Sequence, residues 1–140
     1  MPPEWTELTS DDGFLFCYKA EVLRVVDGDT VDINLHLGCN IEFKIRTRLT
    51  GIDAPEMRGD EKEEGRKARD HLVKLCCLYS LNLRQEGKFS GNAKLYVRTH
   101  KDKQGSFGRY LAELVGIDQY DNIVVLNEKM VEDGHAVSSS

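Results

Sequence analysis

The segment that decides the fold is residues 30–49, TVDINLHLGCNIEFKIRTRL. Apolar and polar residues alternate from Thr30 to Leu37, and the same alternation returns from Ile41 to Leu49. Strict alternation is typical of a strand with one face toward a core and the other toward water. Residues 38–40, Gly-Cys-Asn, separate the two runs as a turn. The segment therefore predicts two strands joined as a hairpin.

The rest of the chain adds strands on both sides of this hairpin, and two helices. Residues 14–26 are rich in aromatic and β-branched residues and predict a strand that ends at the turn signal Asp27-Gly28. Apolar residues recur at helical spacing over 63–79, which predicts an amphipathic helix. The remaining predicted elements are a fourth strand at 80–85, a polar segment at 88–106, a fifth strand at 110–115 and a short helix at 125–132.

Five short strands with a helix after the third are typical of a small Greek-key barrel, the OB fold. The predicted class is therefore α+β, mainly β, with one domain over residues 1–140 and a polar leader over 1–13. A chain of 140 residues suits one hydrophobic core. Because OB folds bind oligonucleotides or oligosaccharides and serve many functions, the site residues must decide the function.

Composition limits the class of protein. Hydrophobic residues make up 40% of the chain and charged residues 31%, as in ordinary globular domains. The longest apolar run is far shorter than the roughly 20 residues that a membrane helix needs. The given N-terminus has neither the basic start nor the apolar stretch of a secretory signal. The four cysteines show no zinc-ligand spacing, so we expect reduced thiols. Reduced cysteines and the missing signal predict a cytoplasmic location, and the short apolar runs predict no membrane partner. We also expect a monomer.

Charge is distributed unevenly around the net value of −5. Residues 80–110 hold seven basic residues against two acidic ones, whereas residues 111–140 hold six acidic residues against one basic residue. A basic segment can contact phosphates. The alternative is a solvated loop followed by an acidic helix, and charge by itself leaves both interpretations open.

The turn after the first predicted strand, VDGDT at residues 26–30, places two carboxylates one residue apart. Ca²⁺ binds several oxygen donors from separate parts of a chain, so this turn can supply one part of a calcium site. The segment does not fit an EF-hand loop, because Asp32 stands where that loop needs glycine. The alternative is a plain hairpin turn.

A second source of carboxylates follows the third predicted strand, in residues 51–56 (GIDAPE). Pro55 fixes its own φ and restrains the residue before it, which can hold Asp53 and Glu56 in a defined relation. The alternative is a solvated loop in which Arg48 pairs with Glu56, a surface contact that contributes little stability.

Together these segments resemble the staphylococcal nuclease (thermonuclease) family. The resemblance rests on VDGDT at 26–30, Arg48 with GIDAPE at 51–56, Gly108-Arg109, Asn127-Glu128 and Gly134, and it covers roughly residues 20–136. It implies a barrel nuclease that uses Ca²⁺ to hydrolyse phosphodiester bonds of DNA and RNA, preferably single-stranded. It also implies products with 3′-phosphate ends.

The resemblance implies a metal site. Asp29 and Asp53 would bind Ca²⁺ through their carboxylates, and Ala54 through its backbone carbonyl. Many members of the family have threonine at the position of Ala54, but a carbonyl ligand survives that change. Asp27 and Thr30 would support the site without binding the ion directly.

The resemblance also implies catalytic residues. Glu56 would act as general base on the attacking water, a role typically worth about 10²- to 10⁴-fold in rate. Arg48 and Arg109 would bind the scissile phosphate, because a guanidinium can hold two oxygens at once and stays charged. Candidate substrate contacts are Arg46, Lys101 and Lys103 for phosphates, with a surface role as the alternative for Arg46, and the ring of Phe107 for stacking on a base.

Two other function classes share the same fold. One is a nucleic-acid or protein-binding module that keeps the barrel without catalysis, and the other is a sugar-binding or interaction domain of the OB type. The full set of five candidate residues favours a nuclease, because a pure binder has no chemical need for all of them: Asp29, Arg48, Asp53, Glu56 and Arg109. The four histidines are scattered along the chain, and we expect surface or partly buried roles for them and no metal ligation.

Overall fold

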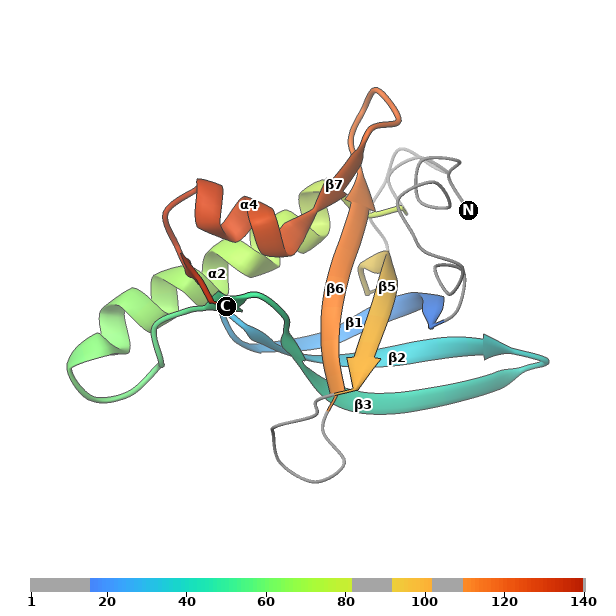
Figure 1. Cartoon of the computed structure of the whole chain (residues 1–140), viewed down its shortest axis with the longest axis horizontal. Helices are drawn as coiled ribbons and strands as arrows, with labels where there is room; N and C mark the ends of the chain where they lie inside the picture. Colours follow the sequence, from blue (N-terminus) through green and yellow to red (C-terminus); the bar gives the residue numbers. More distant parts are fainter. Residues whose placement is uncertain (1–15, 82–91, 102–109, 140) are drawn as a thin grey trace.

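The computed structural model describes residues 16–81, 92–101 and 110–139. Five long strands form the barrel: β1 (Cys17–Asp27), β2 (Thr30–Gly38), β3 (Ile41–Leu49), β5 (Lys94–Lys101) and β6 (Tyr110–Ile117). They lie in the order β3-β2-β1-β5-β6, and β6 also pairs in parallel with β3, which closes the barrel (Figure 1). The fold is therefore the expected α+β, mainly β, five-stranded OB barrel.

Two helices and several short elements complete the described structure. They are β4 (Ile52–Asp53), the 3-10 helix η1 (Gly59–Glu61), α2 (Lys62–Leu78), β7 (Ile123–Val125), α4 (Leu126–Glu132) and β8 (Val137–Ser138). The two helices pack against each other on one side of the barrel (Figure 1). Within the described residues, no helix combines the length and apolar character needed to cross a membrane.

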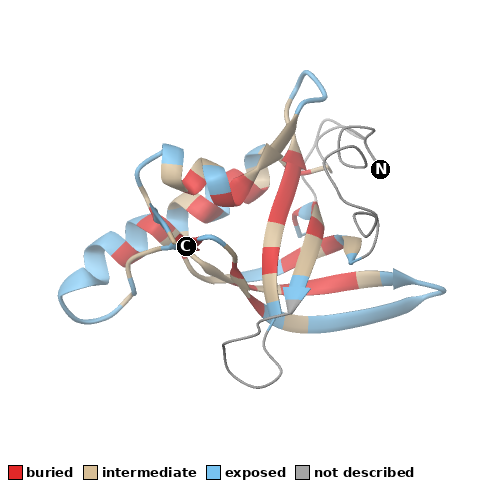
Figure 2. Ribbon diagram, viewed as in Figure 1, coloured by how far each residue is buried: buried red, intermediate tan, exposed pale blue. Residues whose placement is uncertain are grey.

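The core follows from the alternation of the strands and the apolar face of α2. Val31, Ile33 and Leu35 of β2 are buried, and so are Ala68 and Leu72 of the helix. Figure 2 shows the buried positions gathered in the middle of the barrel strands and along one side of α2. Each buried branched aliphatic side chain contributes about 1.5–3 kcal/mol relative to an exposed one.

The hairpin of β2 and β3 extends beyond the closed part of the barrel (Figure 1). Within the described residues, strand β3 pairs with β6 over Thr47–Leu49, at its far end. Thr47 and Leu49 are buried accordingly, whereas Ile41 and Phe43, on the same face, are 57% and 47% exposed. The inward-facing apolar residues of β3 were predicted, but those in its first half are exposed because no strand in the described part of the chain covers them.

The prediction for the fourth strand is wrong. Strand β5 lies at Lys94–Lys101, inside the segment predicted to be polar. Ser80 and Leu81 are outside any strand, and residues 82–85 lie outside the described part. Leu95 and Val97 of β5 are buried in the core. Basic residues on the opposite face make the segment polar overall, so its alternation was not recognised as a strand.

Smaller differences concern the ends of elements. Strand β1 begins at Cys17, three residues later than predicted, and Phe16 just before it has a φ of 66°, which interrupts an extended conformation. Helix α2 begins and ends one residue earlier than predicted, and Val125 belongs to β7 instead of α4. These shifts are within the usual variation of element boundaries.

Candidate functional site

The candidate site lies where the turn between β1 and β2, the end of β3 and strand β4 meet. Arg48 stands opposite Thr30 in the register of β2 and β3. The backbone N–H of Leu49 donates to the carbonyl oxygen of Asp29 at 2.7 Å, which ties the turn to the end of β3. Asp53 follows directly in β4, which pairs with β8. Residues distant in sequence are thus held together by backbone pairing.

Arg48 links two of the predicted carboxylates. Its Nη2 forms an ion pair with Oδ1 of Asp53 and lies 3.7 Å from Oδ2 of Asp29. The same nitrogen donates to the carbonyl oxygen of Ile52 at 3.4 Å. One guanidinium therefore offsets part of the combined charge of the two carboxylates. The alternative pairing of Arg48 with Glu56, considered from the sequence, is wrong.

Asp29 is the more constrained of the two carboxylates. Its Oδ1 accepts a hydrogen bond from the hydroxyl of Thr30 at 3.2 Å, and its Oδ2 accepts one from the backbone N–H of Ala54 at 3.0 Å. The side chain of Asp29 is 14% exposed, compared with 51% for Asp53. The site thus combines a fixed, mostly buried carboxylate with an accessible one.

Asp27 and Glu56 add negative charge beside this pair. The pKa of Asp27 is raised from its ordinary value, first by burial and then by the charges of Asp29 and Glu56, with Arg58 opposing the shift. Glu56 accepts a hydrogen bond from Nε of Arg58 at 2.9 Å, and its side chain is mostly exposed. Arg46 also opposes the rise in the pKa of Asp27. The site therefore holds more carboxylate charge than nearby cations neutralise.

Helix α2 packs closely against both loops of the site. A Cβ atom at Gly28 would lie 2.7 Å from the Cβ of Ala68 and 2.8 Å from the Cβ of Ala54, closer than such atoms approach in proteins. A Cβ at Gly65 would collide with the carbonyl oxygen of Glu56. These supporting residues were not predicted from the sequence. The sequence did contain one sign of this close packing, because two small residues, Gly65 and Ala68, lie three positions apart on the predicted helix.

The predicted substrate contacts are only partly described. Arg46 lies on the outer face of β3, where it forms a two-pronged contact with Asp32: Nε to Oδ1 at 2.7 Å and Nη2 to Oδ2 at 3.1 Å. This pairing fits the alternative surface role of Arg46. To bind a phosphate, Arg46 would have to release Asp32. Lys101 ends β5, but its side chain is not described. The predictions for Lys103, Phe107 and Arg109 lie outside the described residues.

The donors at the site are of the type that suits Ca²⁺. Carboxylate oxygens come from Asp29 and Asp53, with Asp27 nearby, and Ca²⁺ prefers oxygen ligands. The pKa of Asp27 is raised first by burial and then by the charges of Asp29 and Glu56, and a bound cation would offset those charges. Because Arg48 contacts both metal-binding candidates, a bound cation would compete with it for their oxygens. The residues fit the cation in chemistry, and their individual roles remain predictions.

These features define a small OB-fold protein with a carboxylate and arginine site beside the barrel. No protein-family model matches the chain. The chain is 29% identical over 123 residues to micrococcal nuclease of Shigella flexneri, a match that covers 85% of this chain and 57% of that protein. It is also 35% identical over 71 residues to protein ParB of Escherichia coli, covering 51% of this chain and 32% of that protein. The barrel and the first of these matches support a fold like that of staphylococcal nuclease.

The chain covers only part of each of these two proteins. The chain spans just over half of the micrococcal nuclease and about a third of protein ParB.

Proposed function

We propose that the protein is a Ca²⁺-dependent nuclease that hydrolyses phosphodiester bonds of DNA and RNA and leaves 3′-phosphate ends. The observation that carries this proposal is the cluster of Asp29, Arg48 and Asp53, held by backbone pairing at one edge of the barrel. Similarity to a protein named micrococcal nuclease supports it.

Arg48 is the proposed phosphate ligand. A phosphodiester is anionic, and charge builds up on its oxygens as water attacks, so donors aimed at those oxygens lower the barrier. The planar guanidinium can donate to two oxygens at once. On substrate binding, Arg48 would exchange its contact with the accessible Asp53 for the phosphate. Arg109 is proposed as the second phosphate ligand.

Glu56 is the proposed general base. Its side chain is 59% exposed, so a water molecule can reach its carboxylate. Its carboxylate accepts a hydrogen bond from Arg58 at 2.9 Å. Release of Arg58 would free that oxygen to accept a proton from the attacking water.

The proposed metal ligands are Asp29 and Asp53, with the backbone carbonyl of Ala54. When bound, Ca²⁺ offsets negative charge on the phosphate and so favours attack by water. Thr30 holds Asp29 in place through its hydroxyl, and Asp27 adds negative charge that raises affinity for a cation. Asp29, the carboxylate with more hydrogen bonds, is also the more buried of the two.

An aromatic groove on the barrel suits single-stranded substrates. It is lined by Phe16, Tyr18, Phe43 and Tyr110 together with smaller side chains, and Phe16 and Phe43 are largely exposed. Aromatic rings stack on unpaired bases, which a duplex does not offer. Tyr110 stands opposite Thr47 in the register of β3 and β6, next to Arg48 along β3. We therefore propose that single strands are the preferred substrate.

A second candidate function is nucleic-acid binding without cleavage. The ion pairs of Arg48 favour it, because they already offset part of the charge of Asp29 and Asp53 without any metal. The aromatic groove would serve a binding module equally well.

Cleavage of single-stranded DNA and RNA with Ca²⁺, with Mg²⁺ and with chelator separates the two candidates. We expect Ca²⁺-dependent cleavage with 3′-phosphate ends, abolished in Asp53→Ala and retained in Asp70→Ala, which removes an exposed carboxylate on α2. Binding without cleavage would establish the module instead. Cleavage that survives in Asp53→Ala would remove that residue from the proposed metal site.

A further inference from the structure

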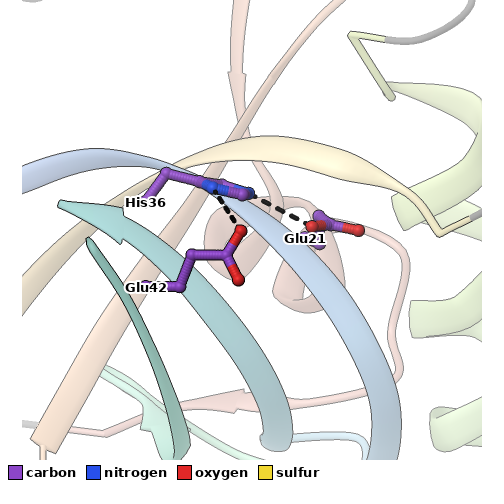
Figure 3. A group of neighbouring side chains, drawn as sticks. All are labelled: Glu21, His36 and Glu42. Carbon is purple, nitrogen blue, oxygen red and sulfur yellow. Dashed lines mark hydrogen bonds and ion pairs between the residues drawn. The ribbon is translucent and has the colours of Figure 1, made fainter. Parts of the chain in front are cut away.

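A second cluster of metal-ligating side chains lies on the outer face of the barrel, formed by Glu21, His36 and Glu42 (Figure 3). His36 Nε2 lies 3.2 Å from Glu21 Oε1, and His36 Nδ1 lies 3.4 Å from Glu42 Oε1. One ligand atom from each of the three residues lies within 4.8 Å of the other two. The three side chains are therefore close enough to share one ion.

Backbone pairing brings this cluster together. In the register of β2 and β3, His36 stands opposite Glu42, and in that of β1 and β2, Glu21 stands opposite Asn34. Directly paired residues of antiparallel strands point to the same face. The cluster thus spans three adjacent hydrogen-bonded strands, which makes its backbone a rigid support for ligands.

Asn34 gives an independent sign that this face binds a ligand. The residue is 4% exposed, and its Oδ1 has no hydrogen-bond partner among the described residues. A buried amide oxygen without a partner is unfavourable, so such atoms are uncommon in folded proteins. Asn34 shares the outer face with His36, two residues away, and stands directly beside Glu21. A cation bound in the cluster would supply the missing partner.

We propose that Glu21, His36 and Glu42 bind a divalent transition-metal cation of the Zn²⁺ type, with Oδ1 of Asn34 as a further ligand. One imidazole nitrogen with carboxylate oxygens suits Zn²⁺, whereas Ca²⁺ takes oxygen ligands. Because a single ion uses only one nitrogen of an imidazole, one carboxylate must move to the side of the other. Glu42 has the room to do so, since its side chain is 53% exposed.

This site is separate from the proposed nuclease site. The pair Thr30–Arg48 and the pair His36–Glu42 are six residues apart along β2, which corresponds to about 20 Å of strand. Lys44, opposite Asn34, is exposed and can direct its ammonium group into solvent. A bound ion would cross-link the three strands near the point where the hairpin leaves the barrel.

Calorimetric titration of the metal-free protein with ZnCl₂ tests the proposal, at mildly alkaline pH where imidazole is neutral. We expect one Zn²⁺ per chain, and binding at least tenfold weaker in His36→Gln and in Glu42→Gln. The matched control is His100→Gln, which removes a histidine whose ring contacts the single carboxylate of Glu113. This control should bind Zn²⁺ as the wild type does.

Two further variants test whether the ion binds elsewhere in the protein. Cys39→Ser removes an exposed thiol from the hairpin turn, and Asp53→Asn changes the proposed calcium site. Unchanged Zn²⁺ binding in both is expected, and loss of binding in either would overturn the proposal. No binding by the wild type, or full binding by His36→Gln, would overturn it as well. Melting curves in chelator show whether each variant is folded, and Glu42→Gln changes only an exposed side chain.

Discussion

Gly28 packs directly against Ala68 of helix α2, so closely that a Cβ atom at position 28 would lie 2.7 Å from the Cβ of Ala68. This contact sets the distance between the helix and the turn that carries Asp27 and Asp29. The position of the acidic turn therefore depends on a helix that contributes none of the proposed metal ligands.

Gly28→Ala is expected to lower the free energy of unfolding by about 1–3 kcal/mol, because overpacking forces neighbouring atoms to shift. It should also reduce nuclease activity by displacing Asp29. Urea unfolding and cleavage assays measure the two effects. Adding Ala68→Gly opens space beside position 28, so the double variant should regain part of both losses. No rescue by that change would show that the contact with Ala68 does not set the position of the turn.

Arg48→Lys is expected to reduce kcat/KM on single-stranded DNA by about 10²- to 10³-fold, the usual effect of losing a transition-state donor. Lysine keeps the positive charge but lacks the planar fork that binds two oxygens. Steady-state kinetics check this, with Arg66→Lys on α2 as the control because its side chain is half exposed and pairs with Glu63. An equal loss in both variants would contradict the proposed role.

Asp27→Asn is expected to stabilise the Ca²⁺-free protein at neutral pH. The pKa of Asp27 is raised above its ordinary value of 3.8, mainly by burial. The folded protein therefore holds this proton more tightly than the unfolded chain, and stability falls as the pH rises from 3.8 through the raised pKa. The gain from Asp27→Asn should shrink as the pH is lowered through the same range.

Asp32→Asn is expected to have the opposite effect on stability. The pKa of Asp32 is lowered, mainly by its hydrogen bond from Arg46. Its stabilising effect is present above the ordinary value of 3.8 and is lost as the pH falls through the lowered pKa. Asp32→Asn should therefore destabilise the protein at neutral pH. Urea unfolding at several pH values tests both variants, and effects of the same sign would contradict this explanation.

Asn127→Ala is expected to lower the free energy of unfolding by about 3 kcal/mol, since it leaves buried backbone groups without partners. Oδ1 of Asn127 accepts from the N–H of Leu114 at 3.0 Å, and Nδ2 donates to the carbonyl oxygens of Thr50 at 2.9 Å and Ala112 at 3.0 Å. Chemical denaturation measures the loss. Asn122→Ala, in an exposed turn, is the control and should cost far less.

The sequence by itself determined the elements whose periodicity is local. The alternation over β2 and β3 and the helical spacing of α2 identified those elements to within a residue, because each face of a strand or helix must match one environment. The motifs at residues 26–30 and 51–56 were likewise visible as runs of special residue types.

Only the tertiary structure decided which of these residues meet. Strand β5 was missed because its short apolar face is recognised only beside β1 and β6. The pairing of Arg48 with Asp53, and the meeting of Glu21 with His36, also depend on other elements. Strand register and helix packing arise from contacts between distant parts of the chain, so local sequence patterns do not specify them.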